Sequence, residues 1–115
     1  MDSLKELNQK HRTFIEDRNW QRHQSPKNLV LALTGEVGEL AEHFQWISQE
    51  ESWKLEGDKK HAVGEELADI LIYLTRISDE LGIDLVAAAH AKCDKNDSKY
   101  PVGKFQGKYK RPHEK

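Results

Sequence analysis

The chain has few of the residues that mark cross-linked, membrane-spanning or sheet-rich proteins. Its single cysteine, Cys93, rules out a disulfide framework within one chain and is predicted to be a small core or half-buried residue in a reducing compartment. No run approaches the roughly 18 apolar residues that a membrane span needs. The N-terminus lacks the apolar stretch of a secretion signal. These absences predict a cytoplasmic protein without a membrane partner.

Strand-like alternation of β-branched residues is also missing, and the three prolines fall where helices would begin or end. An apolar fraction of 37% in 115 residues predicts one domain with a modest core. A homo-oligomer, in which subunits share core, would be easier to stabilise. The formal net charge of −2 argues against a protein that coats nucleic acid.

Apolar residues repeat at helical spacing in four segments. We expect helices over residues 3–18 and 26–48, an acidic loop over 49–58, a third helix that ends near Leu81 and a fourth over 84–100. Short connections between four such helices predict an all-α four-helix bundle.

Local signals support these predicted ends. Ser25 and Pro26 are typical of a helix N-cap and first helical residue. Gly82 is suited to the position after a helix C-terminus, and Asp84 can cap the helix that follows.

The last residues differ in composition from the rest. The segment after Pro101 carries one acidic residue, Glu114, and a series of basic residues: Lys104, Lys108, Lys110, Arg111 and Lys115. We therefore predict a domain over residues 1–102 and a flexible basic tail over 103–115.

Two pairs of carboxylates lie on the two most apolar predicted helices. Glu36 and Glu39 are three residues apart, as are Glu66 and Asp69, so each pair shares one helical face. Each pair borders an apolar stripe, which predicts a position at a helix–helix contact, where unpaired charge is costly. Exposed acidic helix faces are common, and either pair alone is consistent with that simpler interpretation. Four converging carboxylates without a counter-charge indicate a metal site.

The predicted ligands are all oxygen atoms, which suit Mg²⁺, Mn²⁺ or Ca²⁺. Helical bundles that hold two iron ions use Glu-x-x-His pairs, and none occurs here, because His43 follows Glu39 by four residues. Mg²⁺ is the preferred ion and Mn²⁺ a substitute, while a redox-active iron centre is a weaker alternative.

Other side chains continue both acidic faces at helical steps. Trp46 follows Glu39, and Tyr73 and Arg76 follow Asp69. On a continuous helix, Trp46 would lie roughly 10 Å along the axis from Glu39. That length matches the span from a phosphate through a sugar to a base, and aromatic rings stack on bases. By residue type alone, filling of the core is the simpler interpretation of both aromatic residues.

The two acidic pairs together resemble the signature of the MazG-like all-α nucleoside triphosphate pyrophosphohydrolases. Three stretches resemble the dCTP pyrophosphatase branch of that family: RNWQRHQSPKNLVLALTGEVGELAEHFQW, EELADILIYL and KCDKNDSKYP. The likeness covers about residues 4–102, which is most of the chain.

The resemblance implies a helical fold assembled as dimers, or as tetramers made of dimers, with Mg²⁺ bound by the acidic motif. It implies that Lys92 and Asn96 contact the phosphate or sugar, with Tyr100 nearby, and that Lys92 offsets charge that develops during the reaction. By the same resemblance, the base and sugar pocket is formed by His11, Trp20, Trp46 and Tyr73.

The implied reaction is Mg²⁺-dependent hydrolysis of (deoxy)nucleoside triphosphates to the monophosphate and pyrophosphate, with dCTP or a related dNTP preferred. Glu36 or Glu39 would take the proton from the attacking water. The alternative is a non-catalytic helical module that binds nucleotide without cleaving it. Dimeric dUTPases and phosphoribosyl-ATP pyrophosphohydrolases use related carboxylate arrangements, so their substrates remain open as well.

Overall fold

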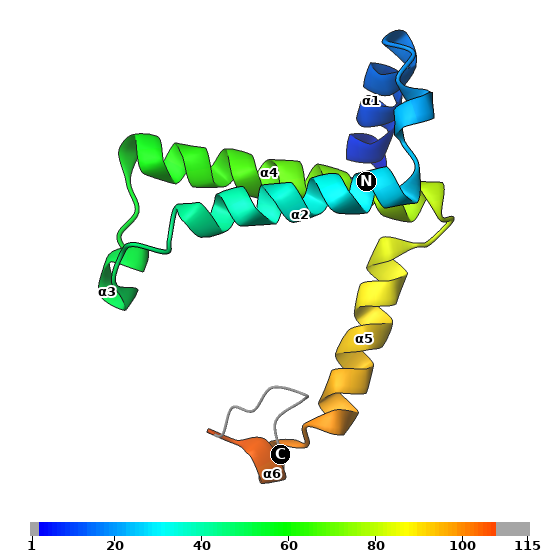
Figure 1. Ribbon diagram of the computed structural model, residues 1–115. Coiled ribbons are helices and arrows are strands. Elements are labelled where there is room, and N and C mark those ends of the chain that lie inside the picture. Colours follow the sequence, from blue (N-terminus) through cyan, green and yellow to red (C-terminus); the bar gives the residue numbers. More distant parts are fainter. Residues whose placement is uncertain (1–2, 108–115) are drawn as a thin grey trace. The chain divides into compact units, whose positions relative to one another are not determined.

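The computed structural model describes residues 3–107, and every regular element among them is a helix (Figure 1). Four helices are long: α1 (Ser3–Asp17), α2 (Pro26–Glu42), α4 (Gly57–Glu80) and α5 (Leu85–Lys99). Three are short: the 3-10 turn η1 (Gln21–His23), α3 (Gln49–Ser52) and α6 (Val102–Phe105). The predicted all-α class with four long helices is therefore confirmed for this part of the chain.

The chain divides after Ile83 into two compact units. The first contains α1 to α4 with η1, and the second contains α5 and α6. Both predicted acidic pairs belong to the first unit.

The predicted helix ends that depend on local hydrogen bonds are confirmed. The Ser25 hydroxyl accepts a hydrogen bond from the Asn28 amide at 3.1 Å and so caps α2. The Asp84 carboxylate caps α5 by accepting from the Ala87 amide at 3.0 Å. Gly82 follows α4 with a φ of +67°, a left-handed conformation that glycine adopts without steric cost.

Helix α2 ends at Glu42, so the prediction of one helix to residue 48 is wrong. A capping box at Ser48 begins a separate helix there, so no single helix runs through residue 48. The Ser48 hydroxyl accepts from the Glu51 amide at 3.0 Å, and the Glu51 carboxylate accepts from the Ser48 amide at 3.1 Å. These bonds hold Ser48 in an extended conformation and begin α3 within the predicted acidic loop. Residues 43–47 form turns between the two helices.

Within the first unit, α2 and α4 lie side by side and α1 packs against α4 (Figure 1). The core is small, as the composition predicted, and its buried apolar side chains among the described residues are Ile15, Leu29 and Val63. The apolar repeat along α4 predicts that its leucines face the core, but Leu67, Leu71 and Leu74 are between 39% and 52% exposed. That prediction is wrong for the single chain, because α1 and α2 cover only part of the surface of α4.

An ion network around the buried Arg76 joins α1 to the C-terminal half of α4. The Arg76 side chain is only 4% exposed. Its guanidinium donates to Asp79 at 2.7 Å and to Glu80 on the same helix, and to the Asn8 side chain of α1 at 3.2 Å. Arg12 of α1 donates to Asp79 through both Nε and a terminal nitrogen. The hydrogen bonds from Arg12 and Arg76 hold the pKa of the Asp79 carboxyl well below its usual range.

In the second unit, Cys93 is exposed on α5, so the prediction that it lies in the core or is half-buried is wrong. The expected boundary between the domain and its tail falls within α6 and stays a prediction. Residues 108–115 of the expected tail lie outside the described residues. None of the helices in residues 3–107 combines the length and the apolarity that a membrane crossing requires.

Candidate metal and nucleotide site

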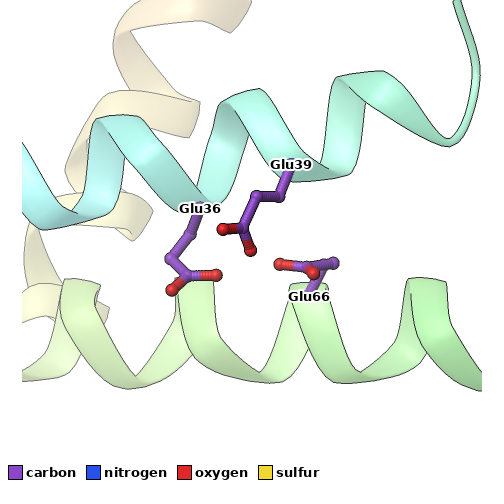
Figure 2. Close-up of side chains that lie close together, drawn as sticks. All are labelled: Glu36, Glu39 and Glu66. Atoms are coloured by element: carbon purple, nitrogen blue, oxygen red, sulfur yellow. The ribbon is translucent and has the colours of Figure 1, made fainter.

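Three of the four predicted acidic ligands converge between α2 and α4. Glu36 and Glu39 extend from α2 toward α4, and Glu66 extends from α4 toward them (Figure 2). One carboxylate oxygen from each residue lies within 4.8 Å of the other two. Glu36 and Glu66 are half-buried and Glu39 is exposed. The prediction that the acidic residues meet at a helix–helix contact is confirmed for these three, and their role as metal ligands stays a prediction.

The charges of this cluster oppose one another. The pKa of Glu36 is raised to about 7, chiefly because its carboxyl can share a proton with Glu66, then because of burial and the nearby charges of Glu39 and Asp69. As ionised groups, Glu36 and Glu66 are both acceptors, and the Oε2 atom of each is buried without a hydrogen-bond partner. A proton or a cation between them would relieve this repulsion.

Asp69 does not belong to the group of three converging carboxylates among the described residues. It lies one helical turn beyond Glu66 and is exposed, so its side chain can turn toward solvent and away from like charges. Its charge still contributes to the raised pKa of Glu36. Its role as a fourth ligand stays a prediction.

The three carboxylates fit a hard divalent cation. Two buried carboxylate oxygens without a hydrogen-bond partner need a counter-charge, and all the donors in the group are oxygen. No histidine or cysteine joins this group within residues 3–107. An all-oxygen donor set of this kind is the one that hard divalent cations prefer.

Binding of Mg²⁺ is expected to weaken as the pH falls below 7. Below its pKa of about 7, Glu36 holds a proton that the cation must displace, whereas above it the carboxylate is free to bind. Isothermal titration calorimetry at about pH 8 and about pH 6 should show a loss of affinity of up to about tenfold per pH unit. Equal affinity at both pH values would show that Glu36 is not a ligand.

Two residues of the predicted base pocket, His11 and Trp20, meet through Phe14. The His11 and Phe14 ring centroids are 5.3 Å apart, and those of Phe14 and Trp20 are 5.7 Å apart with the rings edge to face. The Arg18 guanidinium lies over the outer face of Phe14, 3.7 Å from its centroid. Phe14 was not among the predicted pocket residues. The signal was present, because His11 and Phe14 are three residues apart and so are neighbours on one helical face.

His11 and Tyr73 lie near the acidic residues. Burial lowers the pKa of the His11 imidazole, and the charge of Arg76 lowers it further against an opposing effect of Asp69. Burial raises the pKa of the Tyr73 hydroxyl, and the charges of Glu36 and Asp69 add to this effect. Both side chains are half-buried. The two predicted pocket residues therefore lie within electrostatic reach of the carboxylates.

Trp46 lies in the turns after α2 and is 86% exposed. The prediction that Trp46 lies on the same helix as Glu39 is wrong, because α2 ends at Glu42. Its assignment to the base pocket rests on the resemblance alone and stays a prediction. The other predicted contacts, Lys92, Asn96 and Tyr100, lie in or next to α5 in the second unit, and their roles also stay predictions.

Carboxylates from α2 and α4 meet where these two helices pack together. The protein is therefore an all-helical protein with a candidate site for a divalent metal ion. The chain belongs to the MazG-like family, whose sequence pattern matches residues 32–112 and so includes both acidic pairs. It is 40% identical to the dCTP pyrophosphatase 1 of Rattus norvegicus, over 91% of this chain and 63% of the relative. The human dCTP pyrophosphatase 1 is 40% identical over 87% of this chain and 60% of its own length.

The chain thus spans less than two thirds of the length of these curated relatives. Among solved structures, it resembles a pyrophosphatase from Archaeoglobus fulgidus with a TM-score of 0.82 and 38% identity. That match covers 88% of this chain and 94% of the archaeal protein. At this level of identity and structural agreement, the likeness supports a shared fold.

Proposed function

We propose that this protein is a pyrophosphohydrolase that cleaves a nucleoside triphosphate to the monophosphate and pyrophosphate. The observation that carries the proposal is the convergence of Glu36, Glu39 and Glu66 between α2 and α4. The names of the relatives add support, since each is a pyrophosphatase. A cluster of carboxylates would repel a triphosphate on its own, so the reaction needs a cation between protein and substrate.

Mg²⁺ is the proposed ion, with Mn²⁺ as a substitute. When bound, it would neutralise the charge of the triphosphate and orient a water for in-line attack. Glu36, Glu39 and Glu66 hold it, with Asp69 as the proposed fourth ligand. Either Glu36 or Glu39 accepts the proton from the attacking water, since a carboxylate beside the water can act as a general base.

The proposed substrate is dCTP or a related dNTP. This proposal is supported by the relatives named dCTP pyrophosphatase 1. The aromatic row of His11, Phe14 and Trp20 is suited to the base end of a nucleotide, because flat rings stack on bases. Tyr73 and Trp46 are the further proposed contacts at this end. Lys92, Asn96 and Tyr100 are proposed contacts of the phosphate and sugar.

We propose that the protein acts as a homo-oligomer, a dimer or a tetramer made of dimers. A core of so few buried apolar side chains is small for a domain of this size. Exposed leucines on α4, with Leu31 and Val37 on α2, leave apolar surface that a second copy could cover.

Release of pyrophosphate tests the proposed reaction directly. We expect Mg²⁺-dependent release from a panel of dCTP, dTTP, dUTP, dATP, dGTP, CTP and phosphoribosyl-ATP, with dCTP cleaved most efficiently. EDTA should abolish the release, and excess Mg²⁺ should restore it. A leading rate with dUTP or phosphoribosyl-ATP would keep the reaction and change the substrate. If the folded, metal-bound protein released nothing from any of them, the non-catalytic binding module would replace this proposal.

A further inference from the structure

The attachment of α1 to α4 combines apolar packing with polar contacts of defined geometry. Ile15 is buried, and Leu4 and Leu7 are half-buried. The polar contacts are the two hydrogen bonds from Arg12 to Asp79 and the bond from Arg76 to Asn8. A guanidinium that binds a carboxylate through two nitrogens fixes both distance and orientation. These bonds therefore restrict how α1 can turn relative to α4.

The same corner also holds the segment that follows α1. A small cavity there is lined by Arg12, Arg76 and Asp79 together with Gln21 and Gln24 from and just after η1. Arg76 Nε and Gln24 Oε1 are both buried without a hydrogen-bond partner. A donor and an acceptor facing one polar cavity are the kind of groups that an ordered water bridges. This would tie η1, which begins directly after Trp20, to the network.

The carboxylates and the aromatic row of the proposed site lie on different helices. Glu36, Glu39 and Glu66 lie on α2 and α4, which contact each other directly. His11 and Trp20 lie on α1 and in the connection to η1. Loosening α1 should therefore disturb the aromatic row and leave the three carboxylates in place.

We infer that Arg12 and Asp79 are positioning residues that set the aromatic row of His11, Phe14 and Trp20 against the acidic site and thereby determine base preference. This inference rests on the proposed function. Neither residue belongs to the group of converging carboxylates or to the aromatic row. Both act through the orientation of α1.

The test uses the full chain with Arg12→Ala, and a second variant that combines Asn8→Ala with Arg12→Ala to remove both polar ties from α1. Asp79 stays paired with Arg76 in both variants, so no buried charge loses its partner. The matched control is Lys10→Ala, an exposed cation of the same helix that makes none of these contacts. Arg12→Lys, which keeps the charge and loses the two-nitrogen geometry, should fall between the wild type and Arg12→Ala.

In the double variant, we expect KM for dCTP to rise about tenfold, with a smaller rise for dTTP and with kcat within about twofold of the wild type. Calorimetric Mg²⁺ affinity should not change. The indole N–H signal of Trp20, assigned with Trp20→Phe, should shift in an NMR spectrum of the free protein. Lys10→Ala should show none of these effects.

Two results would overturn the inference: unchanged KM values and base preference in the double variant, or an equal loss of metal binding and of kcat for every nucleotide. A wild type that releases no pyrophosphate would instead refute the proposed function. In that case the Trp20 signal still decides the positioning, since an unmoved signal would show that the ion pair does not place the aromatic row.

Discussion

Glu66→Gln is expected to lower the rate of pyrophosphate release at least about a thousandfold while the protein remains folded. The amide keeps the size of the side chain but removes a charge that the cation needs. Glu66 is the one α4 member of the three converging carboxylates, so its loss leaves only α2 ligands in that group. Steady-state assays with saturating Mg²⁺, together with circular dichroism, would measure both effects.

Glu65→Gln is the matched control, because it makes the same chemical change at the adjacent residue. Glu65 is exposed and pairs with His61 at 2.9 Å one turn earlier on α4. Near-wild-type activity is expected for this variant. If both variants lost activity equally, or if Glu66→Gln kept most of it, the proposed metal site would be wrong.

Glu66→Gln should be less active than the wild type but, without metal and above pH 7, more stable. In the folded protein, the pKa of Glu36 is raised to about 7, and the Glu66 carboxyl is the main cause. A raised pKa means that ionised Glu36 is disfavoured by folding, so stability falls as the pH rises from the ordinary carboxyl value toward 7. Metal-free Glu66→Gln should therefore unfold at a higher temperature than the wild type above pH 7. Added Mg²⁺ should stabilise only the wild type.

Asp79→Ala is expected to lower the free energy of unfolding by about 2 kcal/mol, because it removes one of the two carboxylates that pair with the buried Arg76 guanidinium and the hydrogen bonds that tie Arg12 to α4. The side chain of Arg76 is buried and would keep only Glu80 and Asn8 as partners. Arg12 would lose its partner on α4. Urea denaturation near neutral pH would measure the loss. Asp97→Ala, an exposed aspartate on α5, should change stability by less than about 0.5 kcal/mol.

The pH dependence of this difference follows from the lowered pKa of Asp79. A lowered pKa means that the ionised carboxylate stabilises the folded state above the ordinary value for aspartate, and that this contribution is lost as the pH falls toward the folded-state pKa. The gap between wild type and Asp79→Ala should be the same at about pH 6 and about pH 8 and should shrink below about pH 4. A gap that stayed constant in acid would show that charge is not its cause.

Features that depend on a few neighbouring residues could be predicted from the sequence. The hydrogen bonds of Ser25 and Asp84 cap α2 and α5 as their residue types indicated. The start of α3 was missed although its signal was present, because Ser48 and Glu51 have the spacing of a capping box. The apolar repeat that continues to Ile47 favoured one long helix, whereas the hydrogen bonds of the capping box begin a second one.

Arg76 shows where helical periodicity is insufficient. It follows Glu66, Asp69 and Tyr73 at helical steps, so the pattern places it on the face of the site. In the folded chain its guanidinium binds Asp79, Glu80 and Asn8. The partner from α1 is 68 residues away in sequence, and nothing local to Arg76 indicates it. Helical spacing likewise did not connect His11 and Trp20 with the site. Only the resemblance to the family did so.

The sequence by itself determined that the protein is helical, that each of two helices carries an acidic pair on one face, and that the chain resembles the MazG-like family. Only the tertiary structure decided that Glu36, Glu39 and Glu66 converge while Asp69 stays outside that group. It also decided that an ion network joins α1 to α4. The reason is that spacing along a chain defines angles around one helix axis, whereas the distance and rotation between two helices depend on how their side chains pack.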